Sequence, residues 1–204
     1  MDSHKLSLKL FADNAERLTH DAIVPIFHHW IQEQAFPDHL LIDVADYQHV
    51  HHGPGIVLVS HETNFSTDTA EGRLGLMAQR KQPIPGAASL QDRLASVTAT
   101  ALRACALLEQ DPALAGKLRF RTDEILFRLH DRLLAPNTPE TYRAVEPDLR
   151  SFLSTLYPGD EISLGPRHAP QTLFEVRIRL SSSPPVTDLL ERLEALAPIP
   201  APSR

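Results

Sequence analysis

The sequence predicts an α+β fold in which helices pack on a mostly antiparallel sheet. Segments that alternate apolar and polar residues, as half-buried strands do, are interspersed with segments whose apolar residues recur every three or four positions, as in amphipathic helices. Strands and helices in this order are typical of an α+β domain. The 204 residues suffice for one domain. We expect residues 1–197 to form it and residues 198–204 to be a flexible, proline-rich tail.

The first half of the chain begins with a strand in which Leu6, Leu8 and Leu10 alternate with Ser7 and Lys9. This alternation predicts one buried face and one wet face. A helix follows, capped by Thr19 and running to about Gln34. Pro25 lies inside its apolar pattern, so either the helix is kinked there or its regular part begins there.

Two apolar runs then flank the turn Gly53-Pro54-Gly55. Residues 40–45 are apolar on both faces apart from Asp43, and residues 56–59 are apolar throughout, which predicts a hairpin of two interior strands. The composition turns polar after Asn64, so we expect a loop from there to Arg73. Residues 74–78 form a short candidate strand.

A second half of similar plan runs from Leu118 to Leu180, after a first half from Leu6 to Phe65. The long helix between the halves, over residues 89–110, begins with a capping-box pattern at Ser89 and Asp92. Residues 118–129 predict either a second hairpin or one long bent strand. A helix begins at Pro139 behind the cap Thr138, and it is followed by strands over residues 161–164 and 174–180 and a short helix over residues 187–196. The order strand-helix-strand-strand thus occurs twice, with the 89–110 helix joining the halves.

Composition excludes some classes of function. The net charge is -6, and no basic run exceeds Arg80-Lys81, so nucleic acid is not an expected partner. No segment is apolar over the roughly 18 residues that a membrane span needs. A single cysteine, Cys105, excludes an internal disulfide, and together with the lack of a signal peptide it favours the cytoplasm.

The candidate catalytic residues lie on the predicted hairpin: His61, Glu62 and Asp46. With a loop of two or four residues, His61 would face the side that carries Asp46 and could form a carboxylate-oriented imidazole. With three or five residues, His61 would instead join Tyr47 and His49, and Glu62 would join Asp46. His61 and Glu62 are adjacent on a strand, so they point to opposite faces.

The candidate ligand-binding residues are Tyr47, Asn64, Asp68, Arg73 and Arg132. Arg73 could bind an anionic group through two hydrogen bonds. Arg132 could do so where the helix that begins at Pro139 presents its N-terminus, although a salt bridge and an ordinary helix cap explain that segment as well.

Histidine is frequent, with eleven residues, eight of which lie between positions 20 and 61. His49 and His51 are two residues apart, so on a strand they would share a face and could bind a divalent metal, with His61 or Glu62 completing the site. A solvated, histidine-rich turn is the competing interpretation. No other cofactor is indicated.

The motifs GPG (residues 53–55), HExNF (61–65), GRxGL (72–76) and DRLLAPNT (131–138) resemble those of a bacterial family of uncharacterised proteins. The resemblance covers most of the chain. It implies a bacterial, soluble, single-domain protein, but it implies no activity and transfers no functional residues.

Three functions compete on these grounds. The first is a protein that binds a small molecule or a partner protein at the polar end of the hairpin. The second is a His/carboxylate-dependent or metal-assisted hydrolase or isomerase. The third is a structural or assembly protein, with the hairpin and an exposed strand, residues 174–180, forming a homo-oligomer interface.

Overall fold

The computed structural model describes residues 3–50, 53–69, 72–114, 116–167 and 171–196. The expected tail, residues 198–204, lies outside this set. The strands are β1 (Leu6–Ala12), β2 (Leu41–Asp46), β3 (Ile56–Ser60), β4 (Thr63–Asp68), β5 (Gly75–Arg80), β6 (Phe120–Leu129), β7 (Ile162–Pro166) and β8 (Phe174–Leu180). The helices are a 3-10 turn, η1 (Ala15–Arg17), and α1 (His20–Gln32), α2 (Leu90–Gln110), α3 (Pro139–Leu156) and α4 (Val186–Leu196).

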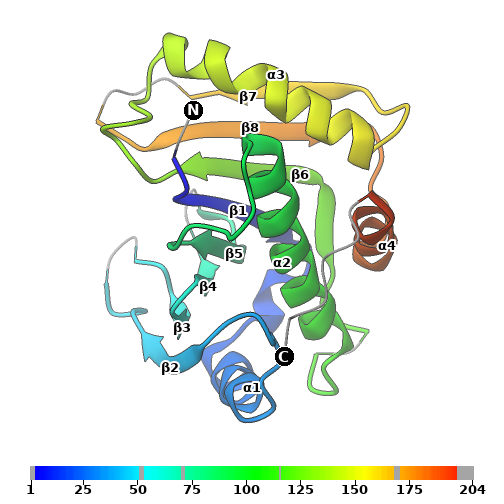
Figure 1. Cartoon of the computed structure of the whole chain (residues 1–204). Helices are drawn as coiled ribbons and strands as arrows, with labels where there is room; N and C mark the ends of the chain where they lie inside the picture. Colours follow the sequence, from blue (N-terminus) through cyan, green and yellow to red (C-terminus); the bar gives the residue numbers. More distant parts are fainter. Residues whose placement is uncertain (1–2, 51–52, 70–71, 115, 168–170, 197–204) are drawn as a thin grey trace.

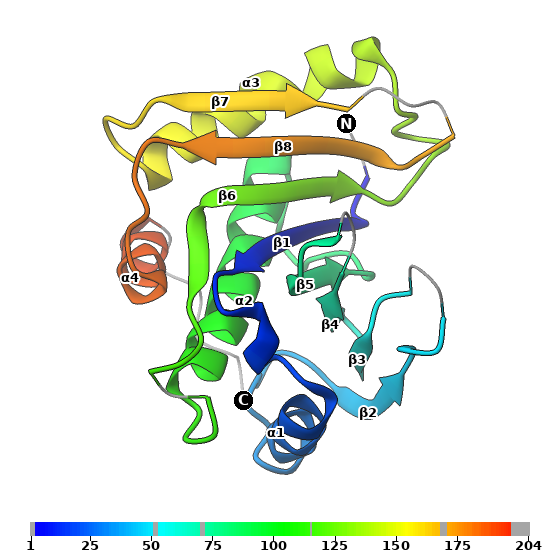
Figure 2. The ribbon, with the colours of Figure 1, turned by 180° about the vertical axis from the view of Figure 1, so that it is seen from behind.

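The strands form one antiparallel sheet in the order β2-β3-β4-β5-β1-β6-β8-β7, and the helices pack against it (Figure 1). The predicted α+β class is therefore confirmed. Helix α1 packs on β2 and β3, α2 on β5 and β1, and α3 on β7. Seen from behind, strands β1, β6, β8 and β7 pass in front of α2 and α3 (Figure 2), so these helices share one face of the sheet.

The predicted starts of the helix between the halves and of the first helix of the second half are both confirmed. Ser89 and Asp92 form a reciprocal capping box at the start of α2, and the hydroxyl of Thr138 accepts a hydrogen bond from the Thr141 amide at the start of α3. Helix α1 begins at His20, so Pro25 lies inside it. No helix in the described residues is long and apolar enough to cross a membrane.

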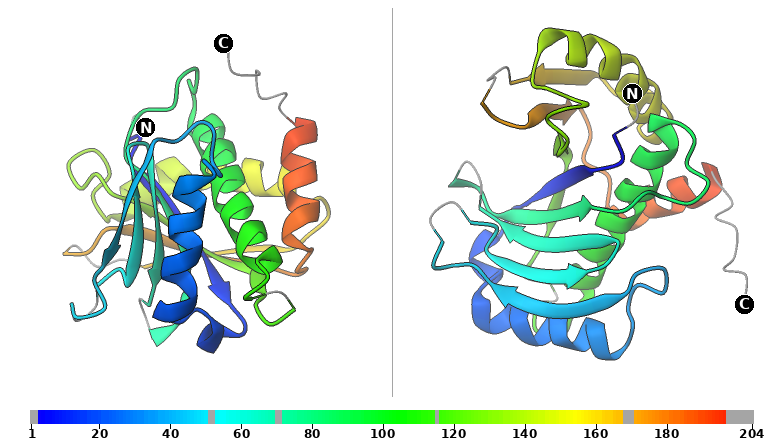
Figure 3. Two further views of the ribbon diagram at one scale, coloured as in Figure 1. Left: turned by 90° about the horizontal axis from the view of Figure 1, so that it is seen from below. Right: turned by 60° about the vertical axis from the view of Figure 1, so that its left-hand side comes forward.

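The two halves meet at the centre of the sheet. Strands β1 and β6 each begin a half and pair antiparallel with one another. Each is followed by a helix and then by antiparallel strands, the last of which returns to pair with it: β5 with β1, and β8 with β6. The first half differs in having two additional strands. The view from below in Figure 3 places the curved sheet on one side and α1, α2 and α4 on the other.

The prediction that residues 40–45 form an interior strand is wrong. Strand β2 is at the edge of the sheet and pairs only with β3, and Leu40 and Ile42 are 64% and 55% exposed. Strand β3, which has the same apolar character, lies between β2 and β4, and four of its five residues are buried. No residue of β2 is fully buried, because this strand has a neighbour on one side only.

The predicted loop from Asn64 to Arg73 is also wrong over its first part, because residues 63–68 form β4. Phe65 is the only large apolar side chain in this strand, and it reaches the main core, while Thr63 and Thr67 fill the remaining buried positions beside it. A strand with one apolar anchor does not show the alternation by which strands are recognised.

Two strands are more buried than their alternation predicts. Strand β1 was expected to have one wet face, yet Ser7 and Lys9 are 0% and 1% exposed. Strand β8 has the predicted bounds, but it lies inside the sheet between β6 and β7, and Arg179 is its one exposed residue. An interface through β8 at a sheet margin is therefore excluded. Within residues 118–129, where either a hairpin or one long bent strand is predicted, residues 120–129 form a single strand, β6.

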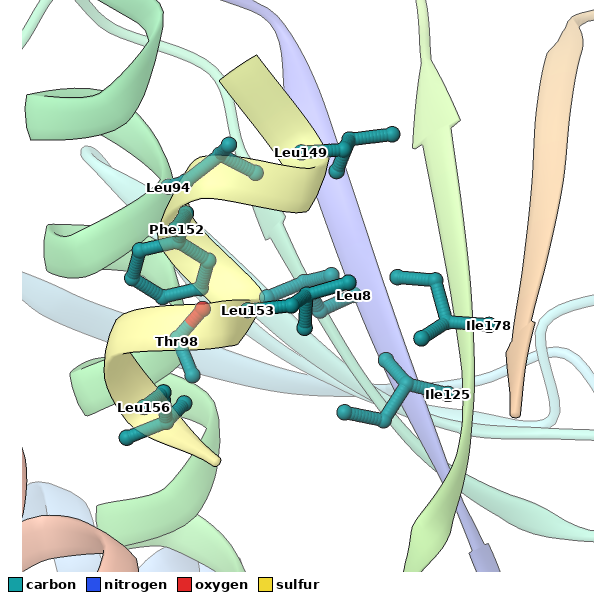
Figure 4. Close-up of a pocket in the computed structure, with 9 residues that line it drawn as sticks. All are labelled: Leu8, Leu94, Thr98, Ile125, Leu149, Phe152, Leu153, Leu156 and Ile178. Carbon is teal, nitrogen blue, oxygen red and sulfur yellow. The ribbon is translucent and has the colours of Figure 1, made fainter. Parts of the chain in front are cut away.

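The core between helices and sheet contains a small void of about 10 Å³. Its lining comes from α2, α3 and the strands, as Figure 4 shows: Leu8, Leu94, Thr98, Ile125, Leu149, Phe152, Leu153, Leu156 and Ile178. Thr98 supplies the only polar side chain, and its hydroxyl finds no hydrogen-bond partner among the described residues. A water molecule needs two to four polar partners, so this space is a packing defect and not a ligand site.

We expect Thr98→Val to raise the free energy of unfolding by about 1 kcal/mol, because the substitution keeps the shape and removes a buried hydroxyl without a partner. Urea denaturation monitored by circular dichroism measures the change. The matched control is Thr100→Val in the same helix, where the hydroxyl donates to the Ser96 carbonyl at 3.0 Å and its loss should not stabilise. Destabilisation by Thr98→Val would mean that its hydroxyl is hydrogen-bonded after all.

Candidate anion-binding site

The face of the sheet opposite α2 carries a layer of polar, charged and apolar side chains, which we call the helix-free face. Side chains on a strand alternate between faces, and Leu6, Leu8 and Leu10 of β1 point to the main core. The strand register places the intervening residues in rows across the sheet. The central row is Ala45, Val57, Ser66, Met77, Lys9, Leu126, Arg177 and Gly165.

Lys9 stands in the middle of this row with its side chain 1% exposed. Its ammonium group donates to the Asp68 carboxylate at 2.6 Å and to the Arg73 carbonyl at 2.6 Å. Burial lowers the pKa of Lys9, and the charge of Asp68 partly offsets that effect. The two contacts bind the end of β4 and the start of β5 to the central strand.

A bulge lies beside Lys9. Leu10 pairs with Ile125 and Ala12 with Phe120, so residues 121–124 of β6 stand opposite Phe11 alone. Figure 2 shows β6 turning sharply along its length. Bulges bend a strand and redirect its side chains, and they are frequent next to functional sites. Here the bulge directs Arg121 and Glu124 towards a common point.

On the other side of Phe11 the chain requires glycine. Gly75 pairs with Phe11, and a Cβ atom at this position would lie 2.2 Å from the Leu10 carbonyl oxygen. Gly75, the second glycine of the GRxGL motif, therefore lets β5 approach β1 closely. This approach brings Arg73, two residues earlier, over the Phe11 ring, with its guanidinium carbon 4.0 Å from the ring centroid.

Four arginines surround one carboxylate at this place. We define the arginine cluster as Arg73, Arg121, Arg177 and Arg179 around Glu124. Glu124 is 8% exposed, and its oxygens lie 2.8 Å from Arg73, 3.6 Å from Arg177 and 3.9 Å from Arg121. Arg179 pairs directly across from Glu124 on β8 and is exposed.

The arginines differ in what holds them. Arg121 forms a bidentate pair with Asp123, through hydrogen bonds of 3.0 and 2.8 Å, which raises the pKa of Arg121. Burial lowers the pKa of Arg177, and so does the neighbouring charge of Arg179. Two like charges at adjacent positions on one face stabilise an anion that binds between them. Guanidinium groups arranged in this way are suited to pairing with carboxylate or phosphate groups.

A second polar group lies further along the same face. The guanidinium of Arg128 donates to Glu175 at 2.6 Å, and it lies 3.9 Å from Asp68. Next to it, His130 contacts the Ser7 hydroxyl at 2.8 Å and the Gln79 amide at 3.2 Å. Burial, with a smaller contribution from the charge of Arg128, lowers the pKa of His130 to about 4, so its imidazole is neutral at pH 7.

Three of the predicted ligand-binding residues lie on the helix-free face. Asp68 and Arg73 are joined through Lys9, and Arg73 belongs to the arginine cluster. Asn64 lies on the same face of β4, four residues from Asp68, and accepts a hydrogen bond from the Ser60 amide. The structure brings Asp68 and Arg73 together, although the sequence predicts a loop for both.

The predicted catalytic residues are not brought together in this way. Asp46 pairs with Ile56 and Leu41 pairs with Ser60, so Asp46 and His61 lie at opposite ends of the hairpin, roughly 15 Å apart. The connection spans residues 47–55, so it is longer than the loops of two to five residues on which the predicted pairings depend. Asp46 contacts His20 at 3.2 Å, while Glu62 accepts a hydrogen bond from the Leu40 amide.

The remaining candidates lie on exposed segments. Tyr47 and His49 are in the connection between β2 and β3, and Arg132 is in the turn before α3, where Asp131 caps the Leu133 and Leu134 amides. His51 lies outside the described residues. Among the described residues, no group of three His, Cys, Asp or Glu side chains is placed to hold a metal ion.

Five members of the site were not predicted from the sequence: Lys9, Arg121, Glu124, Arg177 and Arg179. A signal did exist, because Arg177 and Arg179 alternate with apolar residues on β8 and must therefore share a face. Comparison of the chain with protein-family models, with curated proteins and with solved structures found no match. The resemblance to a bacterial family consequently stays a prediction.

Two half-buried histidines make the stability depend on pH. Burial, with a smaller contribution from the charge of Arg80, lowers the pKa of His39 to about 4, as it does for His130. The unfolded chain takes up these protons near pH 6.5, whereas the folded chain does so only near pH 4. The free energy of unfolding is therefore highest above pH 6.5. It decreases as the pH falls from 6.5 to 4, by at most about 3 kcal/mol for each histidine.

His130→Gln should flatten the dependence of the unfolding free energy on pH between 7 and 4, whatever its effect on stability at pH 7. Urea titrations at several pH values measure this slope. The control His28→Gln changes an exposed histidine on α1 and should keep the slope of the unmodified protein. Equal slopes for all three proteins would show that His130 is not held neutral in the folded state.

Proposed function

We propose that this protein is a cytoplasmic binding protein that takes a small anionic molecule on its arginine cluster. The observation that supports the proposal is that the Arg73 guanidinium is held in place and yet partly exposed. Its guanidinium is stacked on Phe11 and held by Glu124, yet the side chain remains 36% exposed. A guanidinium that is oriented in advance loses little freedom when it binds an anion.

The surroundings support a ligand on this face. Arg73, Arg121 and Arg177 are partly exposed, at 36%, 37% and 24%. Arg121 and Arg177 project from strands, which hold a site more rigidly than loops do, and Arg73 lies just before β5 with its carbonyl bound by Lys9. The net charge of -6 disfavours a long polyanion such as nucleic acid. A small molecule with a carboxylate or phosphate group fits a cluster of this extent.

The enzyme alternative has less support. His61 and Asp46 are at opposite ends of the hairpin. The imidazole-hydroxyl pair of His130 and Ser7 has a geometry suited to proton transfer, but Ser7 is 0% exposed and no substrate can reach it in this conformation.

Binding of inorganic phosphate, measured by isothermal titration calorimetry, tests the proposal. We expect Arg179→Ala to weaken phosphate binding about tenfold or more, because it removes a charge-assisted contact. Arg132→Ala is the matched control, since it removes an exposed arginine outside the cluster and should leave the affinity unchanged. No detectable binding of phosphate to the unmodified protein at about 10 mM would contradict the proposal.

Assembly through the β2 edge is a second candidate, favoured by four exposed apolar side chains: Leu40, Ile42, Tyr47 and Val50, which are 64%, 55%, 42% and 43% exposed. The backbone of this edge is partly protected, since the Val44 amide is satisfied by the Asp43 carboxylate and the ladder is irregular between Leu41 and Asp43. Contact would therefore be made by side chains more than by an added strand.

The double variant Leu40→Ser, Ile42→Ser separates these candidates. If β2 forms a homo-oligomer interface, the variant should sediment as a smaller species than the unmodified protein in analytical ultracentrifugation, with an unchanged circular dichroism spectrum because both residues are exposed. Leu133→Ser, at a 95% exposed position in another segment, is the control. A monomeric unmodified protein would remove this candidate.

A further inference from the structure

Strand β7 forms the margin of the sheet beside β8 and borders the arginine cluster (Figure 2). Its residues Ile162 and Leu164 pack against the main core, so Ser163 and Gly165 point to the helix-free face. Both of these small residues are exposed. Within β7, therefore, no large side chain covers the arginines of β8 on this face.

The register places each small residue opposite an arginine. Ser163 pairs with Arg179 and Gly165 with Arg177, and residues directly opposite each other in an antiparallel pair share a face and lie about 5 Å apart. Arg177 and Arg179 are two residues apart on β8, a separation of about 7 Å. The two guanidinium groups and the Ser163 hydroxyl therefore come from neighbouring positions on one face.

The backbone does not require glycine at position 165. A Cβ atom there would lie 3.7 Å from the Arg177 carbonyl oxygen, which is an ordinary van der Waals distance, and the backbone is not in the left-handed region. The pairing of β7 with β8 is regular, so Gly165 makes no bulge. Glycine weakens a strand, and where neither a bulge nor a close backbone contact explains it, it is typical of a place where a ligand approaches.

Two hydrogen-bond donors beside this glycine are available to a ligand. Arg179 is exposed and makes no ion pair or hydrogen bond within the described part of the chain. The Ser163 hydroxyl likewise has no hydrogen-bond partner among the described residues. An anion held by Arg179 can therefore accept a hydrogen bond from Ser163 as well.

We propose that Ser163, together with Arg177 and Arg179, binds the phosphoryl group of a phosphate monoester whose ester group extends over Gly165 towards solvent; this inference rests on the proposed function. A phosphoryl group presents three acceptor oxygens, and donors on three separate residues match them. A carboxylate has two oxygens, which a single guanidinium can bind together. The Ser163 hydroxyl is therefore needed for a phosphoryl group and not for a carboxylate.

Ser163→Ala tests the inference in calorimetric titrations with inorganic phosphate, methyl phosphate and acetate, at about pH 8, where the phosphates are dianions. We expect the variant to bind both phosphates about tenfold more weakly, because one hydrogen bond to a charged group is lost, and acetate less than about threefold more weakly. Ser163→Thr keeps the hydroxyl and should keep the phosphate affinity. Ser154→Ala is the matched control, since it changes an exposed serine on α3.

Gly165→Val tests the path of the ester group independently. Valine suits a strand, and its Cβ atom fits at this position, so the fold should be kept. We expect methyl phosphate to lose more affinity than inorganic phosphate, because the new side chain fills the space over which the ester group extends. Equal affinities of this variant and the unmodified protein for methyl phosphate would overturn that path.

The outcomes distinguish the two proposals. If the unmodified protein binds neither phosphate, the proposed function fails and this inference fails with it. If it binds phosphate and Ser163→Ala keeps the affinity, or Ser163→Thr loses as much as Ser163→Ala, only the inference is overturned. Binding of methyl phosphate at least about tenfold more weakly than inorganic phosphate by the unmodified protein would overturn the assignment to monoesters.

Discussion

The helix-free face depends on the burial of one ammonium group, that of Lys9, at the centre of the sheet. An ion moved out of water loses several kcal/mol of hydration, and removal of one member of a buried pair typically costs about 3–5 kcal/mol. The Asp68 carboxylate and the Arg73 carbonyl, each 2.6 Å from its nitrogen, stabilise the charged Lys9 there. These contacts fix the ends of β4 and β5, and so they fix the position of Arg73 and the arginine cluster.

Elements whose stability is local were predicted well. The start of α2 depends on Ser89 and Asp92, three residues apart, and the start of α3 on Thr138 and Thr141, so neighbouring residues contain the whole signal. The predictions for β2 and β4 were wrong for a different reason. The burial of a strand depends on which strands lie beside it. The residues of β2 do not indicate that it is at the edge of the sheet, and the residues of β4 do not indicate that it lies between β3 and β5.

The candidate site was predicted only in part, because its members come from distant segments. Arg73 and Asp68 are polar residues near a glycine-containing motif, which marks them as candidates, whereas the alternation in β1 predicts that Lys9 is exposed. Lysine side chains are ordinarily exposed. Burial of Lys9 depends on the Asp68 carboxylate, which is 59 residues away in the sequence but accepts a hydrogen bond from its ammonium group. Single-strand patterns indicate which residues share a face, as for Arg177 and Arg179, but the meeting of that face with Arg73 follows from the pairing of β1 with β6.

That pairing also explains why the cluster lies where it does. Arg73 comes from the first half of the chain, and Arg121, Glu124, Arg177 and Arg179 come from the second, so the group forms only where the halves join. Regular pairing across the junction would bury apolar side chains on both sides. Instead, the β6 bulge opposite Phe11 and the close approach of Gly75 leave a short irregular stretch, and charged side chains converge on the Phe11 ring. The charged side chains of the helix-free face thus gather where the two halves of the sheet pair least regularly.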